Sequence, residues 1–154
     1  MGRPIFFNNK LDGEIGFYDL SDLASLNINL DKVPPWLIYV FGSNRKGIHG
    51  AGAALYARNN FGARIGQGVG FQGQSYGIPT KNDPKQKGLP LNQIAEEVDQ
   101  FCEFTQEYRE LNFLVTAIGT GFAGHDHKDI APMFNAATNC WFTILWSRYM
   151  YKFW

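Results

Sequence analysis

The sequence predicts an α/β domain with a mixed, largely parallel sheet, and three observations support this class. Residues 36–41 (WLIYVF) and 112–118 (NFLVTAI) are continuous apolar runs, which are typical of strands buried on both faces. A glycine-rich loop directly follows each run. Segments with helical spacing lie between the runs, and strands that alternate with helices indicate parallel pairing.

Length, composition and charge narrow the function classes. The 154 residues are 45% hydrophobic and 16% aromatic, which predicts a single folded domain over 1–154. Fourteen basic and fourteen acidic residues give a formal net charge of zero, so the charge does not point to nucleic acid as a partner. The chain has no apolar run long enough for a membrane span and no signal-peptide core at its start, so we expect a cytoplasmic protein with no membrane partner.

The N-terminal part, residues 1–35, is expected to be irregular. It contains a candidate edge strand at 5–9, a turn within 12–20 and a candidate short helix at 22–30, after which Pro34 and Pro35 end the segment.

The regular pattern begins with the strand at 36–41. The first glycine loop leads into a predicted helix over 52–61, which ends at Gly62. A second strand is predicted over 75–80, followed by a polar stretch.

The second half continues the alternation. A long helix is predicted from the spacing of Leu91, Ile94, Ala95, Val98, Phe101 and Cys102. The strand at 112–118 follows, then the second glycine loop and a short helix over 129–137 with Pro132 in its first turn. Cys102 and Cys140 lack metal-type spacing, and we expect two buried, reduced thiols.

The C-terminal segment starts like a strand and ends in scattered aromatic residues. Two alternatives remain: these side chains form a partner surface, or they pack back onto the domain. The residues concerned are Trp146, Tyr149, Tyr151, Phe153 and Trp154.

The first glycine loop has the chemistry of a phosphate site. Gly50, Ala51 and Gly52 have little bulk and precede a helix, whose N-terminal N–H groups attract anions. Neither usual motif fits: Ile48-His49 replaces the Lys-Ser/Thr of a P-loop, and Leu55 replaces the third glycine of a dinucleotide fingerprint. The glycines could instead serve close packing of helix and sheet. A second glycine loop on the same rim favours the phosphate cradle.

The second loop carries similar features. The N–H groups of Gly119, Thr120, Gly121 and Gly124 could hold a second phosphate, and Phe122 could cover a sugar or base. All three histidines, His49, His125 and His127, lie in or beside these loops. With Asp126 they match zinc by ligand type, but solvated loop histidines are the more common case, and we expect neither a metal nor a cofactor.

Three segments together resemble the macro domain family, in particular the branch of the terminal ADP-ribose protein glycohydrolase and related ADP-ribose-phosphate phosphatases. They are GAGAALYARNNFG (50–62), SYGIPTK (75–81) and TAIGTGFAGHDHKDIAPMF (116–134). The resemblance covers about 36–140. It implies a three-layer α/β/α fold with a cleft for ADP-ribose or an ADP-ribosylated target.

The resemblance also implies roles for single residues. Gly50, Ala51 and Gly52 would face the diphosphate and distal ribose, and Asn44 would lie near that ribose. Lys81 matches the lysine with which the glycohydrolase branch attacks the distal ribose. The second loop, 119–122, would hold phosphate.

One departure from the branch concerns its chemistry. The catalytic aspartate falls at Ala123, so Asp126, three residues later, becomes the candidate acid, with His49 or His125 as further candidates. The adenine-selecting aspartate of the family has no clear match in the N-terminal region.

Three functions follow as alternatives. The first is an ADP-ribosyl glycohydrolase-type enzyme that depends on Lys81. The second is a non-catalytic reader or sponge for ADP-ribose-like nucleotides, consistent with Ala123. The third is a protein-interaction domain on the same scaffold. Because the glycine loops are intact while the acid is missing, binding is favoured and hydrolysis stays open.

Overall fold

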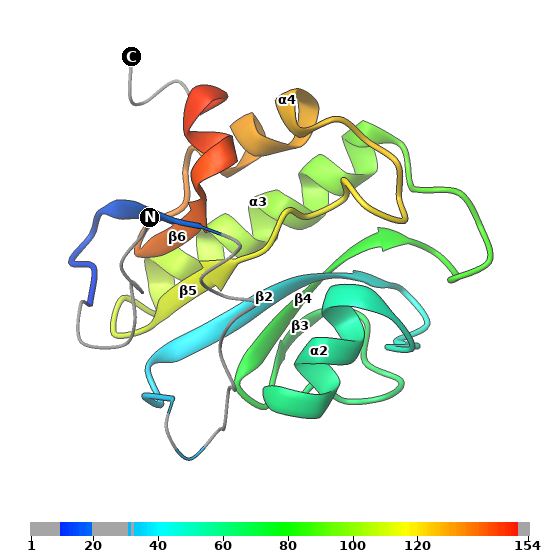
Figure 1. Cartoon of the computed structure of the whole chain (residues 1–154), viewed down its shortest axis with the longest axis horizontal. Helices are drawn as coiled ribbons and strands as arrows, with labels where there is room; N and C mark the ends of the chain where they lie inside the picture. The colour runs from blue at the N-terminus through cyan, green and yellow to red at the C-terminus, as the bar shows by residue number, and fades with distance from the viewer. Residues whose placement is uncertain (1–9, 20–30, 32, 151–154) are drawn as a thin grey trace.

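The described part of the chain forms one twisted sheet with helices on both sides. The computed structural model describes residues 10–19, 31 and 33–150. In these residues the sheet has six strands in the order β1-β6-β5-β2-β4-β3 (Figure 1). The strands are β1 (Ile15–Tyr18), β2 (Leu37–Asn44), β3 (Gly70–Gln72), β4 (Ser75–Lys81), β5 (Asn112–Val115) and β6 (Cys140–Thr143).

Pairing in the sheet is parallel except at one edge. There the short strand β3 runs antiparallel to β4, whereas every other neighbouring pair is parallel. The carboxyl ends of the parallel strands therefore share one edge of the sheet, where ligands of open α/β sheets bind.

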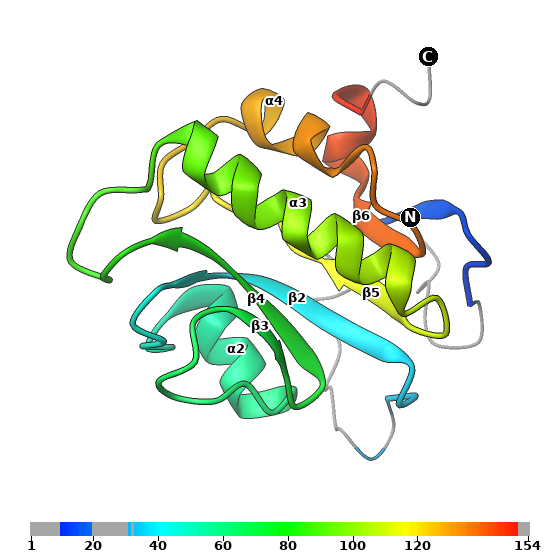
Figure 2. The same ribbon diagram turned by 180° about the vertical axis from the view of Figure 1, so that it is seen from behind.

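The helices complete three layers, which confirms the predicted α/β/α class. Helix α2 (Gly52–Asn60) covers one face of the sheet. Helices α3 (Leu91–Glu107) and α4 (His127–Ile130) cover the other face, as Figures 1 and 2 show from opposite sides. Two 3₁₀ turns, η2 (Ala131–Phe134) and η3 (Ile144–Arg148), follow α4 and β6. No helix among the described residues has both the length and the apolarity that crossing a bilayer requires.

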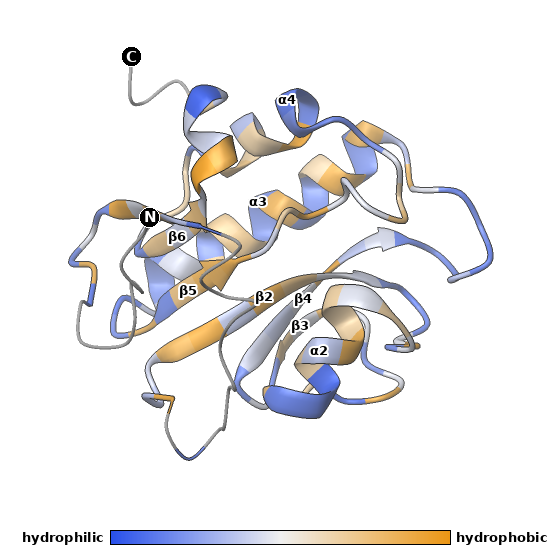
Figure 3. Ribbon diagram, in the orientation of Figure 1, coloured by the Kyte–Doolittle hydropathy of each residue, from blue (hydrophilic) through white to orange (hydrophobic). Residues whose placement is uncertain are grey.

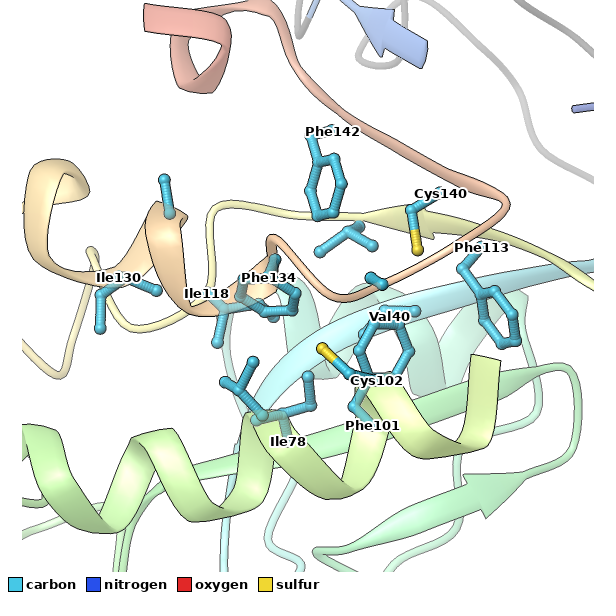
Figure 4. Close-up of a cluster of buried hydrophobic side chains, with 14 of the residues drawn as sticks. Val40, Ile78, Phe101, Cys102, Phe113, Ile118, Ile130, Phe134, Cys140 and Phe142 are labelled. Carbon is cyan, nitrogen blue, oxygen red and sulfur yellow. The ribbon is translucent and has the colours of Figure 1, made fainter. Parts of the chain in front are cut away.

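The larger core lies between the sheet and α3 (Figure 4). Phe101 of α3 packs edge-on against Phe113 of β5, with ring centroids 5.3 Å apart, and against Phe134 of η2 at 5.8 Å. All three rings are fully buried, and each such burial stabilises the fold by about 2 kcal/mol. Figure 3 shows the matching pattern, with hydrophobic residues along β2 and β5 and hydrophilic residues on the connecting loops.

A second hydrophobic core holds α2 against the face of the sheet that α3 does not cover. Tyr39 of β2 stacks on Phe61 at a centroid distance of 4.7 Å, and the small residues Ala54 and Ala57 let the helix approach the strands. This packing determines where the N-terminus of α2 lies, namely beside the carboxyl end of β2.

Most predicted elements are confirmed, with shifted ends. The strands expected at 36–41 and 75–80 are β2 and β4, and the helices expected at 52–61 and from Leu91 are α2 and α3. Strand β5 ends at Val115, three residues early. The helix expected at 129–137 begins instead at His127 and tightens into η2 at Ala131.

Two strands were not predicted, and the N-terminal part is therefore less irregular than expected. Strand β1 contains Gly16, where an added Cβ would lie 2.6 Å from Cδ1 of Trp141. A glycine required by close packing weakens the strand signal in the sequence. Strand β3 has only three residues, too few for a periodic pattern, and turns at Gly73 with φ +58°.

The C-terminal aromatic residues that the structure describes pack back onto the domain. Trp146 is fully buried, and Tyr149 is partly buried against the same core. The partner-surface alternative is therefore wrong for these two residues. The remaining aromatics (151–154), the candidate strand at 5–9 and the whole candidate helix at 22–30 lie outside the described residues.

Candidate functional site

Two glycine-rich loops and one lysine meet at the carboxyl edge of the sheet. The first loop follows β2, the second follows β5, and Lys81 ends β4. Because β5, β2 and β4 are parallel neighbours, these ends lie side by side. They border a cavity of about 680 Å³, a size typical of small-molecule sites. Its lining consists of residues 42–44, 48, 50–54, 80, 81, 84 and 116–123.

The first loop is held in shape by its own backbone and by Asn44. The Asn44 side chain donates to the carbonyl of Ile48 at 2.7 Å and accepts from the Ile48 N–H at 3.1 Å. Asn44 lines the cavity, as predicted for a ligand-facing residue, but both ends of its amide group also serve the loop.

Helix α2 starts at the cavity without a capping side chain. Its N-cap is Ala51, which makes no side-chain hydrogen bond to the helix. Gly50, Ala51 and Gly52 are exposed and line the cavity. The first N–H groups of an α-helix have no partner within the helix, so this end offers hydrogen-bond donors to an anion.

His49 lies behind the loop rather than in the cavity. It is 1% exposed, and its Nε2–H donates to the carbonyl of Gln67 at 3.0 Å. Its ring meets Phe41 edge-on at 5.2 Å. His49 is absent from the cavity lining, so in this structure it supports the loop and does not face a ligand.

The second loop is anchored at both ends. The N–H of His125 donates to the carbonyl of Gly119 at 3.0 Å, and the His125 ring bonds to the carbonyl of Leu89 at 2.8 Å. The hydroxyl of Thr120 donates to the carbonyl of Ala117 at 2.8 Å. Gly124 adopts φ +78° and lies just outside the cavity lining.

The two loops touch at two places. A Cβ added at Gly42 would lie 3.7 Å from the backbone nitrogen of Gly119, so the loop bases are adjacent. Further out, a Cβ added at Gly52 would lie 2.9 Å from Cε2 of Phe122. The Phe122 ring therefore rests on the backbone at the start of α2.

Comparisons with known proteins agree with this architecture. No protein-family model and no curated protein sequence matches the chain. Solved structures are similar, among them the following two. The macrodomain of Thermus aquaticus DarG has a TM-score of 0.56 and 19% identity, over 85% of this chain and 98% of that one. Thermosipho africanus DarTG in complex with ADP-ribose has a TM-score of 0.50 and 14% identity, over 70% of this chain and 38% of that one.

The chain has the macrodomain fold. The expectation of a three-layer, macro-domain-like α/β/α fold is therefore confirmed.

Lys81 lines the cavity, and the other described residues of its lining are uncharged. Its ammonium group donates to the carbonyl of Pro84 at 3.0 Å. Lys81 thus rests against its own loop, at the end of the cavity bordered by Ala123.

Asp126, the candidate acid, is absent from the cavity lining. It is exposed and serves as the N-cap residue of α4. Position 123 itself borders the cavity, and a Cβ added at Gly88 would meet the carbonyl oxygen of Ala123. The loop after β4 therefore lies directly against the place where the branch has its acid.

The histidines are not gathered into a metal site. His49 and His125 bond to carbonyls, and His127 accepts a hydrogen bond from the indole of Trp146 at 2.9 Å. Among the described residues, no group of three or more His, Cys, Asp or Glu side chains is arranged to hold a metal ion.

Ion pairs connect the loop that follows β2 to its neighbours. Lys46 bonds to Asp83 at 2.7 Å, and Arg45 pairs with Glu97 of α3 at 3.6 Å. The hydrogen bond from Lys46 lowers the pKa of Asp83, aided by the N–H of Lys85. Lys46 thus joins this loop to the loop after β4, and Arg45 joins it to α3, although both pairs are near the surface and each is weak.

Asp19 is a candidate that sequence reasoning missed. It directly follows β1 and is partly buried, on the edge of the sheet where the glycine loops leave β2 and β5. It is not part of the cavity lining. The signal that could have found it is an acidic residue immediately after a strand, but that strand was not predicted.

Proposed function

We propose that this macrodomain binds ADP-ribose, or a related nucleotide derivative, in the cavity between its two glycine-rich loops. The observation that carries the proposal is the convergence of the uncapped start of α2 and the loop at 119–123 on one cavity. Both present backbone donors, and the glycines at 50, 52, 119 and 121 leave space beside them, which suits a diphosphate. The complex of Thermosipho africanus DarTG with ADP-ribose, a structure of the same fold, supports this ligand class.

Charge in the cavity supports an anionic ligand. Lys81 is positive, and no carboxylate that would repel a phosphate occurs among the described lining residues. Hydrogen bonds to a charged group contribute about 1.5–3 kcal/mol each, so each donor that reaches a phosphate strengthens binding.

Asp19 is our candidate for the adenine-selecting aspartate that the resemblance leads us to expect. A carboxylate accepts a hydrogen bond from the exocyclic amine of adenine, a donor that bases with a carbonyl at that position lack. Its position after β1 would put the base at the far end of the cleft from Lys81.

Calorimetric titration with ADP-ribose, with AMP and NAD as comparison ligands, tests the proposal. We expect saturable binding of ADP-ribose in preference to AMP. Gly121→Val should weaken it by about tenfold or more, because Gly121 lines the cavity and an added Cβ meets no neighbour within 4 Å, so the fold tolerates it. Ala136→Val, at an exposed position outside the cavity lining, is the matched control. Absence of ADP-ribose binding by the parent protein would contradict the proposal.

Hydrolysis of an ADP-ribose linkage is the second candidate, and the position of Lys81 in the cavity lining favours it. Incubation with an ADP-ribosylated target and chromatography of the products separates this enzyme from a non-catalytic reader. If the protein is an enzyme, Lys81→Ala should abolish turnover but retain much of the binding. Stoichiometric binding without product would instead support the reader, in a cytoplasmic setting that suits the two buried cysteine thiols.

A further inference from the structure

We propose that Phe122 is a gate, which opens and closes over the mouth of the cavity and sets the rates at which ligand enters and leaves. The identity of the ligand rests on the proposed function. The motion of the ring is a property of the free protein and can be tested without a ligand.

Phe122 is unusual among the large apolar side chains of the described chain. It is 74% exposed, more than Ile65 at 66% or Ile144 at 61%, whereas the phenylalanines of the core are fully buried. It also lines the cavity. A phenyl ring with so little packing is weakly held in any one position, because its burial provides little stabilisation.

The contact that Phe122 does make spans the two loops. Its ring rests on Gly52, the first residue of α2, where a Cβ would lie 2.9 Å from Cε2. Gly52 also has φ +58°, a conformation that L side chains rarely adopt. Glycine at this position therefore permits the turn into α2 and lets the ring lie against the helix start, above the donors that would bind a diphosphate.

The loop around Phe122 is anchored at its ends and lightly held between them. Cβ atoms added at Gly121 and Gly124 would meet no heavy atom within 4 Å, so there is open space on those sides. The N–H of Gly124 donates to the carbonyl of Gly121 at 3.0 Å, and Ala123 lies against Gly88. Moving the ring away from α2 therefore requires the turn at 121–124 to open, which is slower than free rotation of an exposed side chain.

The gate has a kinetic consequence. A diphosphate at the start of α2 would lie beneath the ring, so the ring must swing away before the ligand can enter or leave. Removing the ring should raise the association and dissociation rates together. The dissociation constant, which is their ratio, should change less than either rate.

Stopped-flow kinetics with ADP-ribose as the probe tests this consequence. We expect Phe122→Ala to raise both rates by about tenfold, because loop opening then no longer limits exchange. Phe71→Ala is the matched control: Phe71 is 45% exposed, lies on β3 and is absent from the cavity lining. Rates in Phe122→Ala equal to those of the parent would overturn the gate.

Relaxation dispersion of the backbone amide nitrogens of Gly52 and Gly121 tests the motion in the free protein. We expect exchange on the microsecond-to-millisecond scale in the parent and in Phe71→Ala, and its loss in Phe122→Ala. Flat profiles in the parent would overturn the gate even if ADP-ribose binds. Exchange without any ADP-ribose binding would support the gate while refuting the proposed ligand, so the two proposals fail separately.

Discussion

At the scale of single residues, position 123 decides whether the cleft can do chemistry. The methyl group of Ala123 cannot transfer a proton, although Lys81 lines the same cavity. The neighbouring loop meets Ala123 at Gly88, which has no side chain to compete for space beside it. Asp126 is exposed and outside the lining, so its carboxylate is poorly situated to replace the missing acid.

We therefore expect Ala123→Asp to accelerate release of ADP-ribose from an ADP-ribosylated target by about a hundredfold, the order that a positioned acid or base contributes. Product chromatography measures the rate. In this background Lys81→Ala should remove the gain, and Asp126→Asn should retain it. If Ala123→Asp and the parent release product equally, the missing acid does not limit the reaction.

At the scale of elements, Tyr76 joins β4 to α3 beneath the cleft. Its ring lies 5.0 Å from that of Phe101 and 5.1 Å from that of Phe104. Burial raises the pKa of Tyr76 to about 12, and the charges of Glu97 and Cys102 act in the same direction. The folded protein therefore favours the neutral phenol more strongly than the unfolded chain does.

The sign of the pH dependence follows from that raised pKa. The contribution of Tyr76 is fully present below pH 10, the ordinary pKa of tyrosine, and is lost as the pH rises toward 12. The loss amounts to about 2–3 kcal/mol of unfolding free energy. Denaturant unfolding across this range should show a steeper alkaline decline in the parent than in Tyr76→Phe. Tyr108→Phe, at an exposed tyrosine, should decline like the parent; equal slopes in all three would contradict the assignment.

At the scale of the whole molecule, the C-terminal segment connects the cleft to the core. Strand β6 lies between β1 and β5, and Trp146 beyond it is fully buried against Phe134 and Phe142. The indole N–H of Trp146 donates to Nδ1 of His127, the first residue of α4. Because α4 directly follows the second glycine loop, residues 140–150 support the cleft as well as the fold.

Truncating this side chain should therefore destabilise the whole domain. We expect Trp146→Ala to lower the free energy of unfolding by about 3–5 kcal/mol, as for other large core truncations. Trp146→Phe should cost less, and part of its cost is about 1 kcal/mol for the lost hydrogen bond to His127. Urea unfolding measures both. Ile144→Ala, at a 61% exposed residue of the same turn, should stay within about 0.5 kcal/mol of the parent. A similar small effect of Trp146→Ala would show that the segment is not part of the cooperative unit.

The agreement between sequence and structure depends on the kind of signal. The apolar run at 36–41 and the spacing from Leu91 are local patterns, and both elements form as expected. The two glycine loops lie at the same edge of the sheet, as expected, because the carboxyl ends of parallel strands share one edge even where the strand ends are shifted. The resemblance to macro domains implied that Asn44 lies near the ligand, the end of a predicted strand placed Lys81 on the same rim, and both line the cavity.

Packing between residues far apart in sequence determined the features that the sequence did not predict. The sequence suggested that His49 faces a ligand. In the structure its side chain points inward, where it donates a hydrogen bond to the carbonyl of Gln67 and packs edge-on against Phe41. Strand β1 forms by pairing with the edge of β6. Glycine is needed at position 16 because a side chain there would clash with Trp141. By itself, the sequence determined the α/β alternation and the phosphate-type chemistry of the loops, since both depend on neighbours in the chain. Only the tertiary structure brought Phe122 onto Gly52 and buried Trp146, because these contacts join residues far apart in sequence and depend on how the layers pack.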